Sequence, residues 1–339
     1  MKHHRVVVSQ RGGPEMLELV EEDLPEPQKG EVRVKVLAAG VSAYDVMLRS
    51  RSFPGFTRLP YTPGEDIVGV ADKLGEGVTT AEVGQVVGGW SFGRGGGYAE
   101  FICMPAEELV PVPSDLEPAE AVTMIMNYLT AHVALHQTAN VRSGERILVH
   151  GAAGGVGVAL VQLGTMAGLE VYGTASEYNH ELVTALGATP IDYRTEDFVK
   201  RIRRLTGDGV DAVFDVVGGA RQLWRSYRAL RRGGRLVMLG MAGTSKAGLK
   251  IIPASLLTVG LLKLNPDSKR VPMSPGMQNY PQAHNDWYRE ALMEFFDMAL
   301  AGKMKPIVAE RIPLVEVARA HEVLERGGHA GKVILVANT

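Results

Sequence analysis

The sequence predicts an α/β protein in which a doubly wound parallel sheet accompanies a second, mostly β domain. From about residue 119 to residue 262, strand-like segments that are apolar on both faces alternate with segments of helical periodicity. This alternation is typical of a parallel sheet covered by helices. Before residue 118, short β-rich runs separated by turn residues favour a compact antiparallel barrel. With 339 residues, the chain is also too long for one hydrophobic core, so two domains are expected.

The expected elements follow this division. The strands of the first domain are placed at residues 32–41, 66–75, 83–90, 98–104 and 109–113. The strands of the parallel sheet are placed at residues 146–150, 170–175, 190–193, 210–217 and 235–240. Helices are expected where apolar residues recur at helical spacing, at residues 119–135, 156–168 and 196–207.

The C-terminal part of the chain changes in composition. Proline, asparagine, serine and glycine are frequent in residues 263–286, which predicts a long loop, and such loops are often functional. A helix is expected at 287–301, and the tail at 310–336 predicts a helix, a glycine-rich turn and a strand that returns to the first domain. The apolar segment 255–264 is expected to be the last strand of the sheet, with its edge paired to a second copy in a homodimer.

Composition excludes several classes of function. The formal net charge of -2 gives no long-range field that would gather nucleic acid or anionic lipid. The apolar stretches at 121–135 and 251–264 are interrupted by polar residues or proline and are too short to span a bilayer. Cys103 is the only cysteine, so one chain can form neither a disulfide nor a zinc site of several thiolates. These features favour a cytoplasmic protein that acts on a small molecule.

A glycine-rich turn follows the strand at 146–150 and precedes a helix. It contains Ala152, Ala153, Gly154, Gly155, Val156 and Gly157. A strand that enters a helix through such a turn presents backbone N–H groups and the positive end of the helix dipole to an anion. Gly154 lets the backbone approach a pyrophosphate, and Gly157 lets the helix lie close to the strand. The turn therefore predicts a dinucleotide-binding site.

The end of the next strand indicates which dinucleotide binds. A sheet that binds NAD has an acidic residue there, about 20 residues after the turn, to bond the ribose hydroxyls. This chain has Ser176 at that place, which can donate a hydrogen bond to a 2′-phosphate. Glu177 follows and could instead turn back toward a ribose. The absence of a carboxylate on the strand itself favours NADPH over NADH.

Several further stretches, taken with the glycine turn, resemble one family. They are "LPYTPGEDIVGV" and "GGYAEF" in the first domain, "DVVGG" in the second and "AHEVLERGGHAGKVILV" at the end. Together with "HGAAGGVG", they resemble the zinc-independent quinone oxidoreductase (zeta-crystallin-like) branch of the medium-chain dehydrogenase/reductase superfamily. The resemblance implies a GroES-like catalytic domain at 1–122 and an inserted Rossmann domain that binds NADPH at 123–270. It also implies a long loop and a return to the catalytic domain at 271–339.

The resemblance further implies a set of coenzyme contacts. In the glycine turn these come from Ala153, Gly154, Gly155, Val156 and Gly157. Near the nicotinamide they come from Asn127, Thr130, Gly218 and Gly240. The 2′-phosphate is expected at Ser176, Asn179 and Tyr193. Similar proteins have a lysine in the place of Asn179, so NADPH is expected to bind less tightly here unless Arg194 or His180 supplies the charge.

The zinc positions of the superfamily carry other residue types in this chain. Zinc-dependent members have a cysteine in the place of Ser42 or Ala43 and a histidine in the place of Glu65. A hydroxyl, a methyl and a carboxylate do not form the site that zinc prefers, so no metal is expected. Without a Lewis acid, oxidation of a simple alcohol is disfavoured. Transfer of a hydride from NADPH to a quinone or an α,β-unsaturated carbonyl is expected instead.

Tyr44, Ser42 and Asp45 are the candidate catalytic residues, because the acceptor needs positioning and a hydrogen-bond donor for its developing negative charge. Related reductases often have a tyrosine about eight residues after this aspartate, where the chain has Phe53. Protonation then falls to Tyr44, to a water, or to solvent acting on a quinol anion. Asp45 is equally suited to bonding the backbone of its own loop.

Two other functions compete with the reductase. One is an enoyl-thioester reductase in which the loop at 263–286 shapes an acyl channel. The other is a non-catalytic NADPH-binding association protein on the same scaffold, which the changes at Asn179 and Phe53 favour. Tyr98 and Phe92 also have two interpretations, since they either line an aromatic substrate slot or fill the rim of the barrel.

Overall fold

The computed structural model describes residues 1–50, 58–240, 251–272 and 285–337. The chain forms two compact units, of which the first comprises Met1–Leu129 with Gly276–Thr339 and the second comprises Thr130–Pro275. Each unit has its own main sheet. Phe53, the position at which relatives have a tyrosine, and residues 273–284 of the predicted loop lie outside the described residues.

The first unit is built around a seven-stranded sheet with the order β13-β14-β3-β4-β5-β7, in which β6 also pairs with β3. Apart from the parallel pair β13 and β14, neighbouring strands are antiparallel, which confirms the mostly β domain. β1 and β2 form a separate antiparallel pair. The strands are β1 (Lys2–Val7), β2 (Glu18–Asp23), β3 (Glu31–Val41), β4 (Asp66–Leu74), β5 (Val86–Trp90), β6 (Phe101–Pro105), β7 (Leu109–Pro111), β13 (Val308–Pro313) and β14 (Lys332–Val336).

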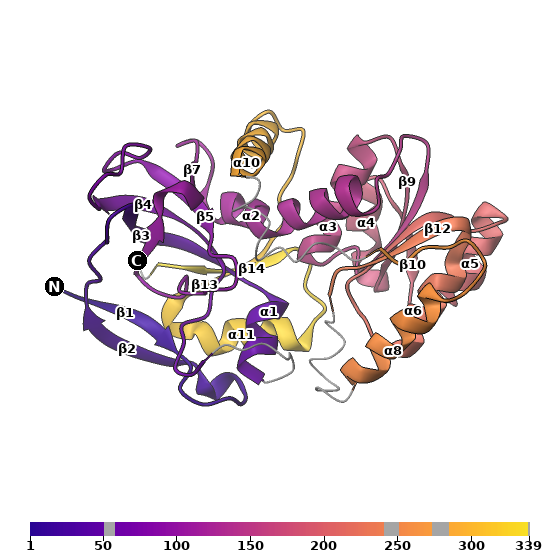
Figure 1. Cartoon of the computed structure of the whole chain (residues 1–339), viewed down its shortest axis with the longest axis horizontal. Helices are drawn as coiled ribbons and strands as arrows, with labels where there is room; N and C mark the ends of the chain where they lie inside the picture. Colours follow the sequence, from indigo (N-terminus) through magenta and orange to yellow (C-terminus); the bar gives the residue numbers. More distant parts are fainter. Residues whose placement is uncertain (51–57, 241–250, 273–284, 338–339) are drawn as a thin grey trace. The chain divides into compact units, whose positions relative to one another are not determined.

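β14, from the C-terminal segment, lies inside this sheet, between β13 and β3 (Figure 1). Val333 of β14 is the antiparallel partner of Val41 on β3. Lys332 and Asp66 of β4 form an ion pair in which both side chains are buried, so two charges that would be costly alone compensate each other. The C-terminal segment is therefore an integral part of the first unit.

The helices of the first unit are α1 (Ala43–Ser50), most of α2 (Pro118–His132), α10 (Asn285–Leu300) and α11 (Val317–Arg326). A π-helical stretch, η3 (Val133–Thr138), continues α2 into the second unit, and 3-10 turns occur at η1 (Pro14–Met16), η2 (Ala106–Glu108) and η7 (Leu314–Glu316). Along α11, Val317, Ala320 and Val323 are buried at three-residue spacing, which places one apolar face on the core. The helix ends at Gly327, whose φ of 69° suits glycine.

The second unit contains a five-stranded sheet with the order β10-β9-β8-β11-β12, and every neighbouring pair is parallel. This order confirms the doubly wound sheet, and its switch point lies between β8 and β11, where such sheets bind nucleotides beyond the strand ends. The strands are β8 (Arg146–His150), β9 (Glu170–Ala175), β10 (Thr189–Asp192), β11 (Val210–Asp215) and β12 (Leu230–Met238). The helices are α3 (Gly155–Met166), α4 (His180–Ala185), α5 (Phe198–Thr206), α6 (Ala220–Ala229) and α8 (Ile251–Lys263), with a 3-10 turn at η4 (Glu177–Asn179).

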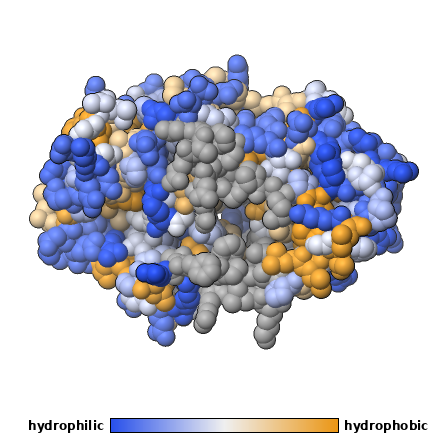
Figure 2. All heavy atoms as spheres, in the orientation of Figure 1, coloured by the Kyte–Doolittle hydropathy of each residue, from blue (hydrophilic) through white to orange (hydrophobic). Residues whose placement is uncertain are grey.

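The prediction of a strand at 255–264 is wrong, because this segment forms most of helix α8. A short apolar run does not distinguish a strand from a helix by its periodicity. Ser255, Val259 and Leu262 are buried at spacings of four and three residues, and α8 packs against α6. The opposite side is exposed, and Figure 2 shows it as an apolar patch formed by Leu256, Leu257, Leu261 and Leu264.

The edge strand β12 pairs with a segment that follows α8 in the sequence. Arg270 accepts a hydrogen bond from the backbone N–H of Leu236 (2.9 Å) and donates its own N–H to the carbonyl of Gly234 (2.9 Å). These bonds form a single parallel bridge between Arg235 and Arg270. The segment after α8, which the sequence assigned to a loop, therefore occupies the place next to β12 that a sixth strand would take.

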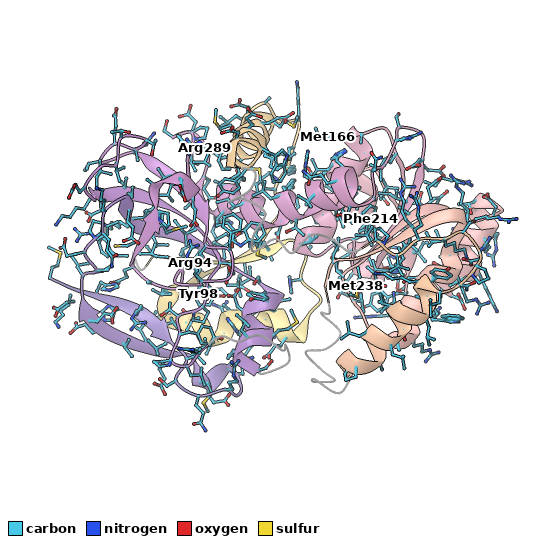
Figure 3. The ribbon with its side chains drawn as sticks, viewed as in Figure 1. Arg94, Tyr98, Met166, Phe214, Met238 and Arg289 are labelled. Atoms are coloured by element: carbon cyan, nitrogen blue, oxygen red, sulfur yellow. The ribbon has the colours of Figure 1, made fainter. Side chains whose placement is uncertain are left out.

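Each unit buries large side chains in its own interior. Phe214 on β11 is fully buried in the second unit, and Tyr98 is fully buried in the first (Figure 3). In the described part of the chain, no helix combines the length and the apolar character needed to cross a bilayer.

Candidate functional site

The glycine turn connects β8 to α3, as predicted for a dinucleotide site. Gly151 has a φ of 66°, and its carbonyl accepts the N–H of Gly154 at 2.9 Å. A Cβ atom on Gly157 would lie 2.0 Å from the carbonyl oxygen of Gly151, which no real contact permits. Gly157 is therefore required for the close approach of α3 to the turn, whereas a Cβ on Gly154 would meet the same oxygen at an ordinary 3.4 Å.

The start of α3 is suited to an anion. Gly154 is the N-cap of the helix and has no side chain to bond the first-turn N–H groups, and the first turn contains no acidic residue. The N–H groups of a first helical turn have no intrahelical acceptors, and the helix dipole makes this end positive. Gly155, Val156 and the neighbouring Ala153 thus form a site whose chemistry fits the pyrophosphate of a dinucleotide.

The end of β9 brings together the three residues expected at a 2′-phosphate. Ser176 donates its hydroxyl to the phenolic oxygen of Tyr193 at 3.2 Å, and this bond, with help from Arg194, lowers the pKa of Tyr193. Asn179 is the last residue of the 3-10 turn η4, which begins directly after Ser176. Its backbone N–H donates to the carbonyl of Ser176 at 2.8 Å. Only one hydrogen is used between the two hydroxyls, so the pair keeps a hydrogen for another acceptor.

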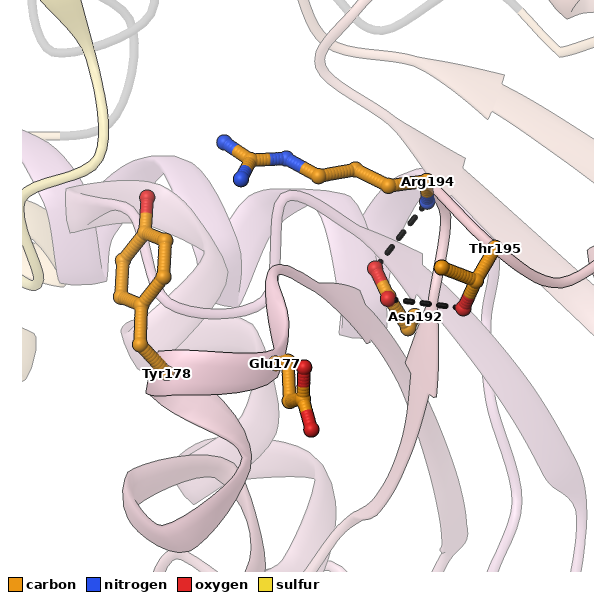
Figure 4. A pocket seen from close by; sticks show the side chains of 5 residues that line it. All are labelled: Glu177, Tyr178, Asp192, Arg194 and Thr195. Atoms are coloured by element: carbon orange, nitrogen blue, oxygen red, sulfur yellow. Dashed lines mark hydrogen bonds between the residues drawn. The ribbon is translucent and has the colours of Figure 1, made fainter.

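Arg194 lies beside two aromatic rings at this place. Its guanidinium carbon is 5.6 Å from the ring centroid of Tyr178 and 5.8 Å from that of Tyr193, distances at which cation–π attraction acts. Figure 4 shows Arg194 extending toward Tyr178 over a shallow pocket of about 360 Å³, which is lined by Glu177, Tyr178, Asp192, Arg194 and Thr195. A cation at the end of β9 is therefore present although Asn179 is uncharged.

Asp192 fixes the turn that carries Arg194. Its carboxylate accepts the backbone N–H of Arg194 at 3.0 Å and the hydroxyl of Thr195 at 2.8 Å, and the bond from Arg194 is the main cause of its lowered pKa. Sequence reasoning missed Tyr178, Asp192 and Thr195. The sequence signal for this turn is Asp192 followed by Arg194 and Thr195, whose N–H and hydroxyl its carboxylate accepts. Such a pattern is typical of an Asx-turn.

The other expected coenzyme contacts lie on three elements. Gly218 follows β11, has a φ of 72° and donates its N–H to Asp215 at 2.9 Å. Gly240 follows β12, and a Cβ there would lie 3.1 Å from the carbonyl oxygen of Val216. Both follow the carboxyl ends of strands, at the same sheet edge as the glycine turn. Asn127 and Thr130 lie on α2, where Asn127 is buried and its amide nitrogen has no acceptor among the described residues.

The candidate catalytic residues lie at the start of α1. The Asp45 carboxylate accepts the N–H of Ser42 (2.9 Å) and its hydroxyl (2.5 Å), while the Ser42 oxygen accepts the N–H of Asp45 (3.2 Å). This reciprocal arrangement is a capping box. The second carboxylate oxygen accepts the N–H of Gly64 at 2.9 Å. The contacts favour the backbone-bonding alternative for Asp45, and Tyr44 lies half-buried in the same first turn.

Glu65 occupies the position at which zinc-dependent members have a histidine. Its carboxylate accepts the N–H of Gly93 at 2.6 Å and the hydroxyl of Ser91 at 3.3 Å. Burial raises its pKa to about 7, and repulsion from Asp45 and Asp66 adds to the effect. Across the residues that the structure describes, no three His, Cys, Asp or Glu side chains are arranged to hold a metal ion.

Glu65→Gln is expected to remove a pH-dependent loss of stability. Folding raises the Glu65 pKa from 4.5 to about 7, so in this window the folded chain holds a proton that the unfolded chain releases. Through this group the free energy of unfolding is highest below pH 4.5 and falls by about 3 kcal/mol as the pH rises through 7. Glutamine keeps an acceptor for Gly93 and never ionises.

Urea unfolding at about pH 5 and pH 8 measures this difference in the free energy of unfolding. The change of that free energy with pH equals, through linkage, the difference in bound protons between the folded and the unfolded chain. Glu107→Gln is the control, because it removes an exposed carboxylate from the same unit. An unchanged pH dependence in the Glu65→Gln variant would show that Glu65 does not titrate in this range.

The aromatic residues near Glu65 are buried. Phe92 stacks on Trp90 with ring centroids 4.8 Å apart, and its φ of 50° is unusual for a bulky residue. The hydroxyl of Tyr98 lies 3.3 Å from Nε2 of His321. Both Phe92 and Tyr98 are less than a tenth exposed. Of the two interpretations, these contacts favour side chains that fill the barrel.

Comparison with known proteins extends this description. Residues 28–114 match the family described as "Alcohol dehydrogenase GroES-like domain", and residues 186–335 match "Zinc-binding dehydrogenase". Human quinone oxidoreductase is 31% identical over 336 residues, which cover 98% of this chain and 97% of that protein. The human synaptic vesicle membrane protein VAT-1 homolog-like is 31% identical over 339 residues, which cover 97% of this chain and 80% of that protein.

A solved structure adds information on the coenzyme. A mycobacterial protein in complex with NADPH is similar with a TM-score of 0.85 and 30% identity, covering 98% of this chain and 99% of that one. A GroES-like domain joined to a Rossmann-like parallel sheet defines the protein as a two-domain oxidoreductase. The chain belongs to the medium-chain dehydrogenase/reductase superfamily, in the branch that holds the quinone oxidoreductases and the VAT-1 proteins. The family resemblance seen in the sequence is thereby confirmed.

Proposed function

We propose that the protein is an NADPH-dependent reductase that transfers a hydride to a quinone or an α,β-unsaturated carbonyl without a metal. One observation carries the choice of coenzyme. Ser176, Tyr193 and Arg194 bring two hydroxyls and a guanidinium together at the end of β9. A sheet that binds NAD has a carboxylate at this place, whereas hydroxyls and a guanidinium suit a phosphate.

Arg194 is proposed to supply the charge that Asn179 lacks. Its backbone is fixed by Asp192, and its guanidinium is flanked by Tyr178 and Tyr193. The two rings restrict the long side chain, so less conformational entropy is lost when a phosphate binds. Glu177 lines the same pocket, but it is exposed and its repulsion of a phosphate is screened by water and salt.

The proposed chemistry needs no group that ionises an alcohol. NADPH supplies the hydride when bound, and the chain positions an acceptor that is already electron-poor. The acceptor oxygen gains negative charge, which a hydrogen-bond donor stabilises. The Ser42 hydroxyl already donates to Asp45, so we propose Tyr44 for this role. Independence from zinc is proposed because Glu65 and Ser42 are both engaged in bonds within the chain.

The test is consumption of NADPH and NADH by the purified protein with three acceptors: a quinone, a small enone and an enoyl thioester. We expect turnover of the quinone or the enone with NADPH, at a rate that a metal chelator does not change. Preference for the enoyl thioester would support the alternative reductase instead. Abolition of turnover by the chelator, with rescue by zinc, would contradict the metal-free mechanism.

A second candidate is coenzyme binding without turnover, as an association protein. The similarity to a VAT-1 homolog-like protein favours it, because that name refers to a vesicle membrane protein rather than an enzyme. The same assay separates the two functions. Tight binding of NADPH with no acceptor consumed would support the association protein and contradict the reductase.

We also propose that the protein is a cytoplasmic homodimer. A single cysteine suits a reducing compartment. The exposed leucines of α8, among them Leu257 and Leu261, form an apolar face that a second copy would cover. Leu257→Glu with Leu261→Glu is expected to shift the mass measured by light scattering from dimer to monomer. Met293→Glu, at a half-exposed apolar residue on α10, is the control, and a monomeric wild type would contradict the proposal.

A further inference from the structure

His150 ends β8, immediately before the glycine turn, and both of its ring nitrogens have partners. Nδ1 lies 3.0 Å from the hydroxyl oxygen of Thr174, and Nε2 lies 3.1 Å from that of Ser226. The ring also contacts the edge of Phe198, with centroids 4.7 Å apart. The side chain is only 2% exposed, and this burial lowers the pKa of His150. The lowered pKa favours the neutral imidazole at neutral pH.

The direction of each hydrogen bond follows from the chemistry of the groups. The oxygen of Ser226 is 2.7 Å from Oδ2 of Asp215, and a carboxylate can only accept, so Ser226 donates to it. The single hydrogen of Ser226 is then used, and its oxygen accepts the N–H of His150 at Nε2. A neutral imidazole has one N–H, so Nδ1 accepts the hydroxyl of Thr174.

Both ends of this chain of bonds reach backbone N–H groups at the coenzyme site. At one end, the Thr174 oxygen accepts the N–H of Gly151 at 3.3 Å, in the glycine turn. At the other, Oδ1 of Asp215 accepts the N–H groups of Val217 and Gly218, each at 2.9 Å, in the turn after β11. These turns follow β8 and β11, the two strands that flank the switch point of the sheet.

We infer that His150 is a positioning residue that holds the glycine turn and the Val217–Gly218 turn in one arrangement for the dinucleotide. The inference rests on the proposed function in so far as NADPH is the ligand. His150 acts through Thr174 on one turn and through Ser226 and Asp215 on the other. Its Nε2–H tautomer is the only one that completes the line of bonds.

A role in packing alone does not account for this arrangement. Thr174, Asp215 and Ser226 are each no more than 3% exposed, and burying polar groups is unfavourable unless they are bonded. Apolar residues of similar size would fill the same volume. They would, however, leave the N–H groups of Gly151 and Gly218 without these acceptors, and each turn would lose one of the bonds that fix it.

The first test uses the wild-type protein. Nitrogen NMR of the histidine rings across the neutral pH range is expected to show His150 as neutral and protonated at Nε2, because the two nitrogens have distinct chemical shifts in each tautomer. A ring protonated at Nδ1, or a charged imidazolium at neutral pH, would overturn the inference. This measurement needs no variant and does not depend on NADPH turnover.

The second test uses two variants, each of which keeps one of the two hydrogen bonds of the His150 ring. The amide oxygen of asparagine in His150→Asn replaces Nδ1 as the acceptor for Thr174, whereas the amide nitrogen of glutamine in His150→Gln replaces Nε2–H as the donor to Ser226. Each variant is expected to weaken NADPH binding about tenfold, since one buried partner is lost. Binding of adenosine 2′-monophosphate, which needs only the site at Ser176 and Arg194, is expected to stay unchanged.

Controls distinguish the outcomes. His321→Gln changes an equally buried histidine in the first unit and should alter neither affinity. Ser226→Ala breaks the bond that His150→Asn breaks and also the bond to Asp215, so the double variant should lose no more NADPH affinity than Ser226→Ala alone. Wild-type affinity for NADPH in both His150 variants, or an additive double variant, would overturn the inference. Failure of the wild type to bind NADPH would instead contradict the proposed function.

Discussion

Replacing Arg194 with alanine is expected to lower the affinity for NADPH by about 10- to 100-fold, the effect of one charge-assisted hydrogen bond. Affinity for NADH, which has no 2′-phosphate, should remain as in the wild type. The reason is that Arg194 is the cation beside Ser176 and Tyr193, since Asn179 is uncharged. Titration of coenzyme fluorescence with NADPH and NADH measures the ratio, and the loss should shrink as the salt concentration rises.

Two variants sharpen this test. Arg204→Ala removes an exposed guanidinium from α5 in the same unit and should leave both affinities unchanged. Asn179→Lys restores the residue of similar proteins and should recover part of the affinity lost in Arg194→Ala. An equal loss for NADPH and NADH in Arg194→Ala would show that Arg194 contacts the adenine or stabilises the turn, rather than binding a phosphate.

Gly157→Ala is expected to destabilise the second unit by about 3 kcal/mol, the upper range for an overpacked site, and to abolish coenzyme binding. The added Cβ would lie 2.0 Å from the carbonyl oxygen of Gly151 and 2.8 Å from its carbon. Both are backbone atoms, so no change of rotamer relieves the clash and α3 must move away from β8. Urea unfolding followed by circular dichroism, with coenzyme fluorescence in parallel, measures both effects.

Gly154→Ala is the matched control at the same turn. Its Cβ would meet only the Gly151 oxygen at 3.4 Å, so the fold should be retained while the methyl group hinders the approach of a pyrophosphate. The expected pattern is loss of binding in both variants and loss of stability in Gly157→Ala alone. Equal stability of the two variants would mean that the helix does not need its close approach to the turn.

The parts of the fold that the sequence predicted correctly depend on local pattern. The valines at alternate positions of β3 and the apolar strands that alternate with helices are visible in short windows of sequence. The segment 255–264 was predicted wrongly because its apolar residues are compatible with either period. What decides its structure is packing against α6 and the pairing of Arg270 with β12, and both are contacts between segments far apart in the sequence.

The candidate site shows the same division. The glycine turn and Ser176 could be predicted because each lies at a fixed offset from a strand. The pKa of Glu65 could not be predicted, because it depends on burial and on neighbouring carboxylates from other segments. The hydrogen bonds through His150 could not be predicted from the sequence either. The residues that form them come from the ends of β8, β9 and β11 and from α6, and only the folded sheet brings them together.

The place of β14 between β13 and β3 affects the order in which the two units can form during synthesis. All five strands of the second unit come from one continuous stretch of chain, so that sheet can assemble as soon as the ribosome has released it. The first unit must wait for the partner of β3 and for Lys332, the counter-ion of Asp66, which are made after the second unit. Until then the part of the first unit that is already made has an unpaired edge on β3, and Asp66 lacks its counter-ion. Unpaired strand edges favour aggregation, so we expect this part of the nascent protein to be the more prone to it.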